Sequence, residues 1–237
     1  MSDGVLTSVR PAHTVQIVKC LTIDGFHPAA ARSIPERGVT LRILLIGSSG
    51  HIGSAVAELL HRSHEVIAVS RSTSPAVDVG DPDSVHALFE GVGPVDAVVV
   101  AVGAAPFKPL ADLNRADFLA GFTAKSLAQI GVVLQGVPYV TDGGSFTLTT
   151  GIVGREVIRT GAASAAANGA IEAFVPSAAA ELPRGLRINA ISPNVLAEAP
   201  GYHSAFPGFV PVSAAAVAQA YVRSIEGITT GRIYPVG

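Results

Sequence analysis

The chain has 237 residues, of which 49% are apolar and 14% are charged, and its formal net charge at neutral pH is −2. This composition predicts a compact globular protein and excludes a disordered one. The small net charge offers no basic surface for nucleic acid or an anionic membrane, and we find no apolar run near the roughly 20 residues of a membrane span. The single cysteine, Cys20, excludes an internal disulfide and a cysteine-based metal site. We therefore expect a soluble, cytoplasmic protein with no metal, nucleic acid or membrane as a partner.

Residues 1–40 lack the regular pattern of the rest of the chain and are interpreted as an N-terminal extension. They contain one strand-like run, Val15–Ile23. Two explanations stay open. Either the stretch is a genuine extension, packed on the domain or disordered, or its start codon was placed too early and the protein begins near Val39. We favour the second, because nothing in these residues completes the domain that follows.

The stretch Leu41–Gly53, LRILLIGSSGHIG, predicts a buried strand, a glycine turn and the start of a helix. Gly47 would permit a tight turn, Gly50 a close approach of the backbone to a pyrophosphate, and Gly53 close packing of helix on strand. The amides at the helix start and the helix dipole would then hold the phosphate charge. The alternative interpretation is an ordinary strand–helix turn that is rich in glycine.

From Leu41 onward, apolar strands alternate with helices, which predicts a parallel sheet with helices on both faces. We expect strands near residues 41–46, 65–70, 75–78, 95–102, 144–150, 186–191 and 232–236. We expect helices over residues 51–62, 82–90, 110–134, 161–181 and 213–226, with Asp81 and Ser213 as N-caps. Residues 41–237 are thus predicted to form one α/β domain, a doubly wound, Rossmann-like parallel sheet of about seven strands.

Four later segments follow the glycine turn in a set order: Asp78-Val79, Val95–Gly103, Gly144–Thr150 and Arg187–Asn194. In this order and spacing the chain resembles the short-chain dehydrogenase/reductase family, from Leu41 to Gly237. The fourth strand departs from that family, since only its last glycine remains of the usual Asn-Asn-Ala-Gly ending. The resemblance implies a nicotinamide cofactor, a small-molecule substrate, and a homodimer or homotetramer that packs through the fourth and fifth helices.

The end of the second predicted strand bears on the choice of cofactor. A carboxylate there would bind the ribose hydroxyls of NAD, whereas an arginine accommodates the additional phosphate of NADP. The chain reads Ser70-Arg71-Ser72 with no acid, so we expect NADP(H) rather than NAD(H), the alternative being a solvated surface arginine. The turn, this pattern and the resemblance together predict a cofactor site formed by Gly47, Ser48, Ser49, Gly50, His51, Ile52, Gly53, Ser70, Arg71, Ser72, Asp78, Val79, Ala101, Gly103, Pro193 and Asn194.

The catalytic positions depart from the family pattern, which is a Tyr-x-x-x-Lys pair on the fifth helix and a serine at the end of the fifth strand. By alignment with that pattern, Ser164 stands at the tyrosine, Asn168 at the lysine, and Thr150 or Gly151 at the serine. Lys125 aligns with an asparagine that the family carries in its fourth helix. We predict a catalytic cluster of Lys125, Thr150, Ser164 and Asn168, in which burial would lower the pKa of Lys125 and make it a proton donor. The alternative for Lys125 is a surface position or a contact to the cofactor ribose.

Three functions stay open at this point. The first is an NADP(H)-dependent oxidoreductase of the short-chain type, acting on a small carbonyl or alcohol with a non-standard proton donor. The second is a non-catalytic NADP(H)-binding sensor or partner protein on the same fold, because the usual tyrosine and lysine are replaced. The third is an isomerase or lyase that uses the cleft without hydride transfer. We favour the first, since a cluster of polar residues at the catalytic positions is easier to explain by a catalytic role than by the loss of an earlier activity.

Overall fold

The computed structural model describes residues 39–237, so the prediction of an extension over residues 1–40 lies, apart from its last two residues, outside the described part of the chain. The described residues form one parallel sheet of six strands in the order β2-β1-β3-β4-β5-β6. The predicted α/β, Rossmann-like fold is thereby confirmed. The strands are β1 (Arg42–Ile46), β2 (Glu65–Val69), β3 (Val95–Val100), β4 (Val140–Thr149), β5 (Arg187–Pro193) and β6 (Ile233–Val236).

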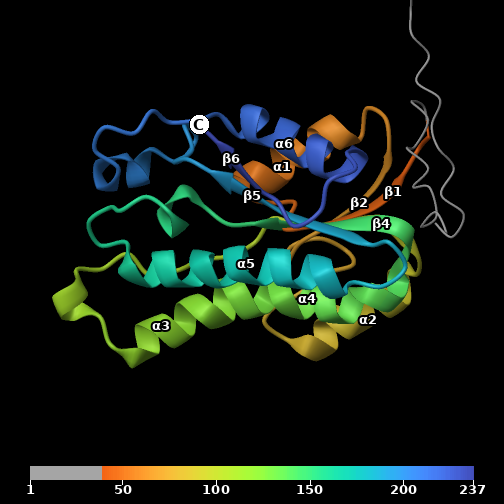
Figure 1. Ribbon diagram of the computed structural model, residues 1–237, viewed down its shortest axis with the longest axis horizontal. Coiled ribbons are helices and arrows are strands. Elements are labelled where there is room, and N and C mark those ends of the chain that lie inside the picture. The colour runs from red at the N-terminus through yellow and green to blue at the C-terminus, as the bar shows by residue number, and fades with distance from the viewer. Residues whose placement is uncertain (1–38) are drawn as a thin grey trace, which may run out of the picture. The chain divides into compact units, whose positions relative to one another are not determined.

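Helices cover both faces of the sheet, with α1 and α6 on one side and α2, α4 and α5 on the other (Figure 1). The α-helices are α1 (His51–Leu60), α2 (Pro82–Val92), α3 (Arg115–Gly121), α4 (Ala128–Gly136), α5 (Ala162–Glu181) and α6 (Ala214–Glu226). A π-helical segment, η2 (Phe122–Leu127), joins α3 to α4. The short 3-10 turns are η1 (Leu110–Asp112), η3 (Val137–Tyr139), η4 (Ile152–Gly154) and η5 (Pro200–Ala205).

The core is divided between the two faces because successive side chains of a strand point in opposite directions. Leu44 and Ile46 of β1 belong to the cluster packed with α2, α4 and α5, whereas Ile43 and Leu45 belong to the cluster packed with α1 and α6. All four side chains are fully buried. Continuous burial of this kind is typical of a parallel strand that is covered on both faces.

The strand predicted over residues 75–78 does not form, and only an isolated bridge joins Ala76 to Ser70. In the turn before it, Thr73 Oγ1 accepts from the amide of Ser70 at 2.7 Å, and its hydroxyl lies within hydrogen-bond distance of two carbonyl oxygens, that of Pro75 at 2.8 Å and that of Ser70 at 3.0 Å. The Thr73 side chain therefore takes up the amide of Ser70, and the one backbone bond between the two segments, both of which lie in the described part of the chain, is the one from the Val77 amide to the Ser70 carbonyl, at 3.0 Å. The segment instead carries Asp78 to the carboxyl edge of the sheet, where it lines a pocket.

The predicted N-caps are confirmed, since Asp81 and Ser213 each accept a backbone amide hydrogen bond at the start of α2 and α6. A third cap was not predicted. Asn114 and Asp117 form a capping box that begins α3, so the helix expected over residues 110–134 begins five residues later, at Arg115, after the separate 3-10 turn η1. The physical reason is that a capping box satisfies two orphan amides at once and so fixes the residue at which a helix begins.

The helical stretch Arg115–Tyr139 is long and apolar enough to cross a membrane. This finding corrects the expectation that the chain has no apolar run near the length of a membrane span. The apolar character of the stretch has another explanation in this fold. Val132 and Val133 are buried in the cluster that covers one face of the sheet, and a layer helix shares its length and composition with a membrane span. We therefore assign the stretch to the helical layer of the domain.

Gly53 is buried near the start of α1, directly against the glycine turn. A Cβ atom at this position would lie 2.0 Å from the carbonyl oxygen of Gly47, which is backbone and cannot rotate away. We expect Gly53→Ala to lower the free energy of unfolding by roughly 1–3 kcal/mol, as measured by urea denaturation. Gly91→Ala in α2 is the matched control, because no neighbouring atom lies within 4 Å of a Cβ there; that variant should be at least as stable as the wild type. Equal stability of the two variants would contradict the close contact.

Candidate active site

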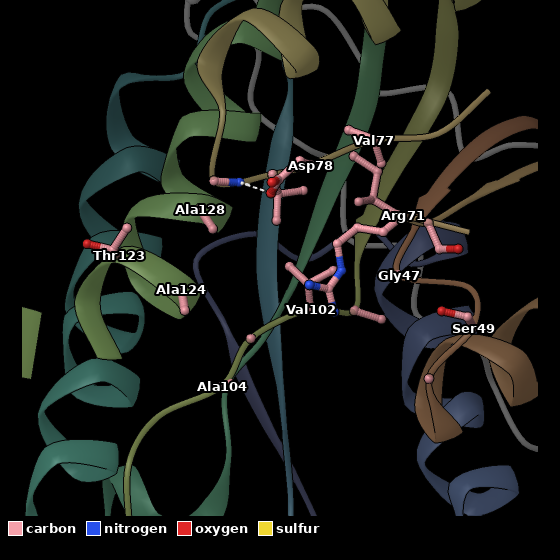
Figure 2. Close-up of a pocket in the computed structure, with 17 residues that line it drawn as sticks. Gly47, Ser49, Arg71, Val77, Asp78, Val102, Ala104, Thr123, Ala124 and Ala128 are labelled. Atoms are coloured by element: carbon pink, nitrogen blue, oxygen red, sulfur yellow. Dashed lines mark hydrogen bonds between the residues drawn. The ribbon is translucent and has the colours of Figure 1, made fainter. Parts of the chain in front are cut away.

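A pocket of about 440 Å³ opens at the carboxyl ends of β1, β2 and β3. From β1 the sheet extends to β2 on one side and to β3 on the other, and open α/β sheets bind ligands in the crevice at such a switch point. Figure 2 shows the pocket between the glycine turn on one side and the helical segment that carries Thr123, Ala124 and Ala128 on the other. Its position and volume are those of a small-molecule or nucleotide site.

The glycine turn brings three backbone segments together at the edge of this pocket. Gly47 has a left-handed φ of 95°, and its amide and that of Ser48 donate to the carbonyl of Val69 at 2.8 and 3.1 Å. A Cβ atom at Gly47 would lie 2.4 Å from the carbonyl oxygen of Ala101. Gly50 is the N-cap of α1, and no side chain caps this helix. The first amides of α1 are therefore open to an anion such as a phosphate.

Arg71 and Asp78 line the pocket from the segment that follows β2. Figure 2 shows the Arg71 side chain reaching across the pocket toward Val102. The Asp78 carboxylate accepts from the amide of Gly80 at 2.9 Å, and the Asp78 amide donates to Ser84 Oγ at 3.0 Å. The carboxylate is thus engaged within its own loop, and the guanidinium of Arg71 is the cationic group that the pocket presents.

The structure distributes the predicted cofactor residues over two pockets. Those that line the first pocket are Gly47, Ser49, Gly50, Ser70, Arg71, Asp78, Val79, Ala101 and Gly103. His51, Pro193 and Asn194 line a second pocket beside it, and Ser48, Ile52, Gly53 and Ser72 line neither. The residues of the first pocket that sequence reasoning missed include Val102, Ala104, Thr123, Ala124 and Ala128. Most of them have small apolar side chains, which carry no chemical signal in a sequence.

The second pocket has a volume of about 300 Å³ and shares residues 103 and 104 with the first. All of the predicted catalytic residues line it, although they come from separate elements. Lys125 lies in η2, Thr150 directly follows β4, and Ser164 and Asn168 lie one turn apart on α5. We call these four residues the polar floor.

The polar floor is largely buried and only partly satisfied. Asn168 Nδ2 donates to the carbonyl oxygen of Ser164 at 2.9 Å and to its Oγ at 3.3 Å. Asn168 Oδ1 is buried and has no hydrogen-bond partner among the described residues. Lys125 Nζ lies 3.5 Å from the carbonyl oxygen of Thr150, and its stem packs on Gly103, where a Cβ atom would lie 2.5 Å from Lys125 Cγ. The floor therefore holds both a donor and an acceptor with capacity for a ligand.

Burial changes the acidity of Lys125. This residue is 9% exposed and forms no ion pair within residues 39–237. Desolvation disfavours its charged form and lowers the pKa of Lys125 from 10.5 to about 8. The group is therefore mostly protonated at pH 7, yet it releases its proton far more readily than a surface lysine.

The remainder of the second pocket is mainly apolar and aromatic. The ring of Phe107 lies 5.6 Å from that of Tyr202 and 6.4 Å from that of Phe206, measured between centroids. Val195 and Leu196, from the loop after β5, line the same pocket. We call Phe107, Tyr202 and Phe206 the aromatic cluster. Such a lining suits the apolar body of a ligand whose polar atoms meet the floor.

Sequence reasoning missed Glu172, which lies on α5 one turn beyond Asn168. Its carboxylate accepts a hydrogen bond of 2.9 Å from Thr150 Oγ1, so it contacts a floor residue without lining the pocket itself. The available signal was the spacing of four residues from Ser164 to Asn168 and again to Glu172, because residues at this spacing share one face of a helix.

Comparison of the sequence with known proteins points to one family. A sequence model described as enoyl-(acyl carrier protein) reductase matches residues 25–229. Carbonyl reductase (NADPH) 2 from Sus scrofa is 28% identical over 185 residues, which cover 68% of this chain and 74% of that protein. L-xylulose reductase from Bos taurus is 24% identical over 180 residues, which cover 65% of this chain and 71% of that protein.

Solved structures agree with this result over most of the chain. The protein lin1944 from Listeria innocua is 46% identical, with a TM-score of 0.81, and the match covers 84% of this chain and 100% of that one. A small-chain dehydrogenase in complex with NADPH is 28% identical, with a TM-score of 0.74, and the match covers 84% of this chain and 97% of that one.

The buried charge of Lys125 should reduce stability. Because its pKa is lower in the folded protein than in the unfolded chain, the unfolded chain binds more protons between about pH 8 and pH 10.5, and stability rises with pH across this window. We expect Lys125→Met to be more stable than the wild type at pH 7, by up to about 3 kcal/mol. This advantage should shrink as the pH approaches 10, which urea denaturation at several pH values measures.

Lys108→Met provides the control for this experiment. Lys108 is a lysine whose side chain is 46% exposed and paired with Asp117, so its removal should give no gain in stability at any pH. A gain for Lys125→Met that is independent of pH would show that the buried charge is not its cause.

Proposed function

The chain belongs to the short-chain dehydrogenase/reductase family, and on that basis we propose that it is an NADP(H)-dependent oxidoreductase that acts on a small carbonyl or alcohol with a non-standard proton donor. One observation carries the proposal. A pocket of nucleotide size, edged by an uncapped helix start, adjoins a second pocket in which a buried lysine lies beside hydroxyl and amide groups. The relatives with oxidoreductase names support the same reaction class.

The residues of the first pocket fit a pyridine dinucleotide. Backbone amides at the start of α1 would hold the diphosphate, because the turn leaves no space for a Cβ at Gly47 and no side chain occupies the helix start. The nucleotide, when bound, would supply the hydride. Its reactive end would lie near residues 103 and 104, which the two pockets share, and thus beside the polar floor.

The preference for NADP(H) rests on Arg71. The guanidinium lines the pocket at the end of β2, and the neighbouring residues are Ser70 and Ser72 rather than an acid. An arginine can donate two parallel hydrogen bonds to a phosphate, whereas a carboxylate at this place would repel it. The NADPH in the name of one relative and in one similar solved structure supports the same preference.

Lys125 is the proton donor in this proposal. As the carbonyl carbon of the substrate gains a hydride, its oxygen takes a proton from the Lys125 ammonium, and the product is an alcohol. The neutral amine then regains a proton from solvent. A pKa of about 8 keeps the amine protonated at pH 7 and makes it a stronger acid than a solvated lysine. Ser164, whose Oγ already accepts from Asn168, is free to donate its own proton to the same oxygen.

The aromatic cluster favours a substrate with an apolar body. Phe107, Tyr202 and Phe206 would cover this body, while the reacting oxygen would lie on the polar floor. Lys125 is the one Lys or Arg side chain in the described lining of this pocket. We therefore propose a small, uncharged and largely apolar carbonyl compound, or the corresponding alcohol.

The second candidate function is a non-catalytic NADP(H)-binding sensor or partner protein. It is favoured by the hydrogen bonds that Asn168 donates to Ser164, because these two residues stand where the resemblance to the family places its lysine and tyrosine. A serine hydroxyl is a far weaker acid than a phenol, and an asparagine carries no charge to adjust it. A protein of this kind would bind NADP(H) at the same site without catalysing a reaction.

We also propose that residues 41–237 form the catalytic domain of a cytoplasmic homodimer or homotetramer. Assembly through the helices is supported by Leu119, Leu127 and Leu134, which are large apolar side chains exposed along α3, η2 and α4. A cytoplasmic location is supported by the single cysteine of the chain, because proteins of oxidising compartments commonly carry paired cysteines.

Removal of Arg71 tests the choice of cofactor. We expect Arg71→Ala to weaken NADPH binding by roughly tenfold to a hundredfold, since a hydrogen-bonded charge contributes about 1.5–3 kcal/mol, and to leave NADH binding nearly unchanged. Fluorescence titration with each nucleotide measures both constants. Arg62→Ala at the end of α1, where Arg62 pairs with Glu58 on the surface, is the control and should affect neither. Equal losses for NADPH and NADH in Arg71→Ala would remove the argument for the phosphate contact.

Removal of Lys125 tests the proton donor. We expect Lys125→Met to slow NADPH oxidation by a panel of apolar carbonyl compounds roughly 10²–10⁴-fold, the usual contribution of a general acid, and Ser164→Ala to slow it less. In the wild type, the rate of reduction should fall as the pH rises past about 8, because Lys125 loses its proton there.

Three outcomes of that experiment separate the alternatives. Full activity of both variants would overturn the assignment of the donor. A loss of NADPH affinity as large as the loss of rate would identify Lys125 as a contact to the cofactor ribose instead. Tight NADPH binding by the wild type without turnover of any compound in the panel would favour the non-catalytic function.

A further inference from the structure

Glu172 lies on α5, one turn beyond Asn168 and two turns beyond Ser164. Its side chain is 13% exposed, although carboxylates are among the side chains that are least often buried. The mechanism proposed above assigns it no role. The contacts of the Glu172 carboxylate explain why it lies beside the polar floor.

Groups from three separate segments hold the Glu172 carboxylate. Oε1 accepts from Thr150 Oγ1 at 2.9 Å and from Ser192 Oγ in β5 at 3.4 Å. Oε2 lies 3.5 Å from Nε of Arg155, which follows η4 and balances the carboxylate charge. The carboxylate thus joins α5 to the ends of two neighbouring strands, at the edge of the sheet where the second pocket opens.

These contacts determine the direction of the Thr150 hydroxyl. An ionised carboxylate can only accept hydrogen bonds, so Thr150 must give its single hydroxyl proton to Glu172. The lone pairs of Thr150 Oγ1 are then left to accept from other groups. Lys125 is the one lysine among the described residues that line the pocket. Its Nζ lies 3.5 Å from the carbonyl oxygen of Thr150.

We infer that Glu172 is a positioning residue, which fixes Thr150 as a hydrogen-bond acceptor in the second pocket and so leaves Lys125 and Ser164 as the donors to the substrate oxygen. Without this bond, the Thr150 hydroxyl would be free to rotate toward Lys125, whose Nζ lies 3.5 Å from the carbonyl oxygen of the same residue, and a hydrogen bond donated to the neutral amine would favour its unprotonated form. The catalytic consequence rests on the proposed function, whereas the orientation of Thr150 is a property of the protein alone and is tested without a substrate.

Two substitutions with the same change of charge isolate this effect. Glu172→Gln and Glu172→Leu both remove the negative charge, but only the glutamine keeps an oxygen that can accept from Thr150. Glu181→Gln, at the exposed end of the same helix, controls for a general loss of charge. Circular dichroism and thermal melting establish that each variant is folded before any comparison is made.

The readout is the pKa of Lys125, measured by NMR in protein labelled with ¹³C at lysine Cε. The chain has lysines only at positions 19, 108 and 125, so the resonance is assigned by its loss in Lys125→Met. Other charged or titratable groups around the pocket are Arg155, His51 and Tyr202, and all stay unchanged in these variants.

We expect the pKa of Lys125 to be lower in Glu172→Leu than in Glu172→Gln by about half a unit or more. This difference should vanish when Thr150 is also replaced by valine, because the hydroxyl that transmits it is gone. Glu181→Gln should leave the pKa unchanged. In turnover with an apolar carbonyl compound, the pH at which the rate falls should move with the pKa of Lys125 in each variant.

A difference between the leucine and glutamine variants that persists in the Thr150→Val background would overturn the inference, as would equal pKa values in the two. If the NMR result is as expected but no variant and no wild type turns over any carbonyl compound, then the proposed reaction fails while the positioning of Thr150 stands.

Discussion

The backbone of Gly47 lies in van der Waals contact with β2 and with the segment after β3, and the geometry of the whole site follows from this contact. Its amide bonds to Val69, and a Cβ atom at Gly47 would overlap the carbonyl of Ala101. Gly53 in turn packs against the Gly47 carbonyl. Because three backbone segments meet without intervening side chains, α1 begins at the edge of the sheet with its amides directed toward the crevice.

Burial of Lys125 is the second constraint, and it acts against stability. The stem of this lysine rests on Gly103, the residue at which the two pockets join, so a larger residue there would displace the ammonium. A buried charge without an ionic partner is costly in a folded protein and is seldom kept without a use. The low pKa of Lys125 and its position beside the first pocket both follow from this packing.

In the second pocket, the polar floor and the aromatic cluster come from different parts of the fold. The polar floor comes from η2, from the end of β4 and from one face of α5, whereas the aromatic cluster comes from the segments after β3 and β5. Loops vary more readily than the elements they join. In the proposed reaction the polar floor would supply the chemistry, and the loop residues Phe107, Tyr202 and Phe206 would determine the shape of the substrate.

The amino-acid sequence by itself determined the order of the strands and helices, the glycine turn, the caps Asp81 and Ser213, and the presence of the four floor residues. All of these depend on side chains that are close along the chain, or on a motif with fixed spacing. The strand expected over residues 75–78 did not form beyond a single bridge, because the side chain of Thr73 took up the amide of Ser70 at the end of β2. Only the tertiary structure decided that Lys125 is buried, that Arg71 lines the first pocket and that Glu172 holds Thr150. This burial and these hydrogen bonds depend on segments that lie far apart in the chain and meet in space. Local sequence patterns therefore do not predict them.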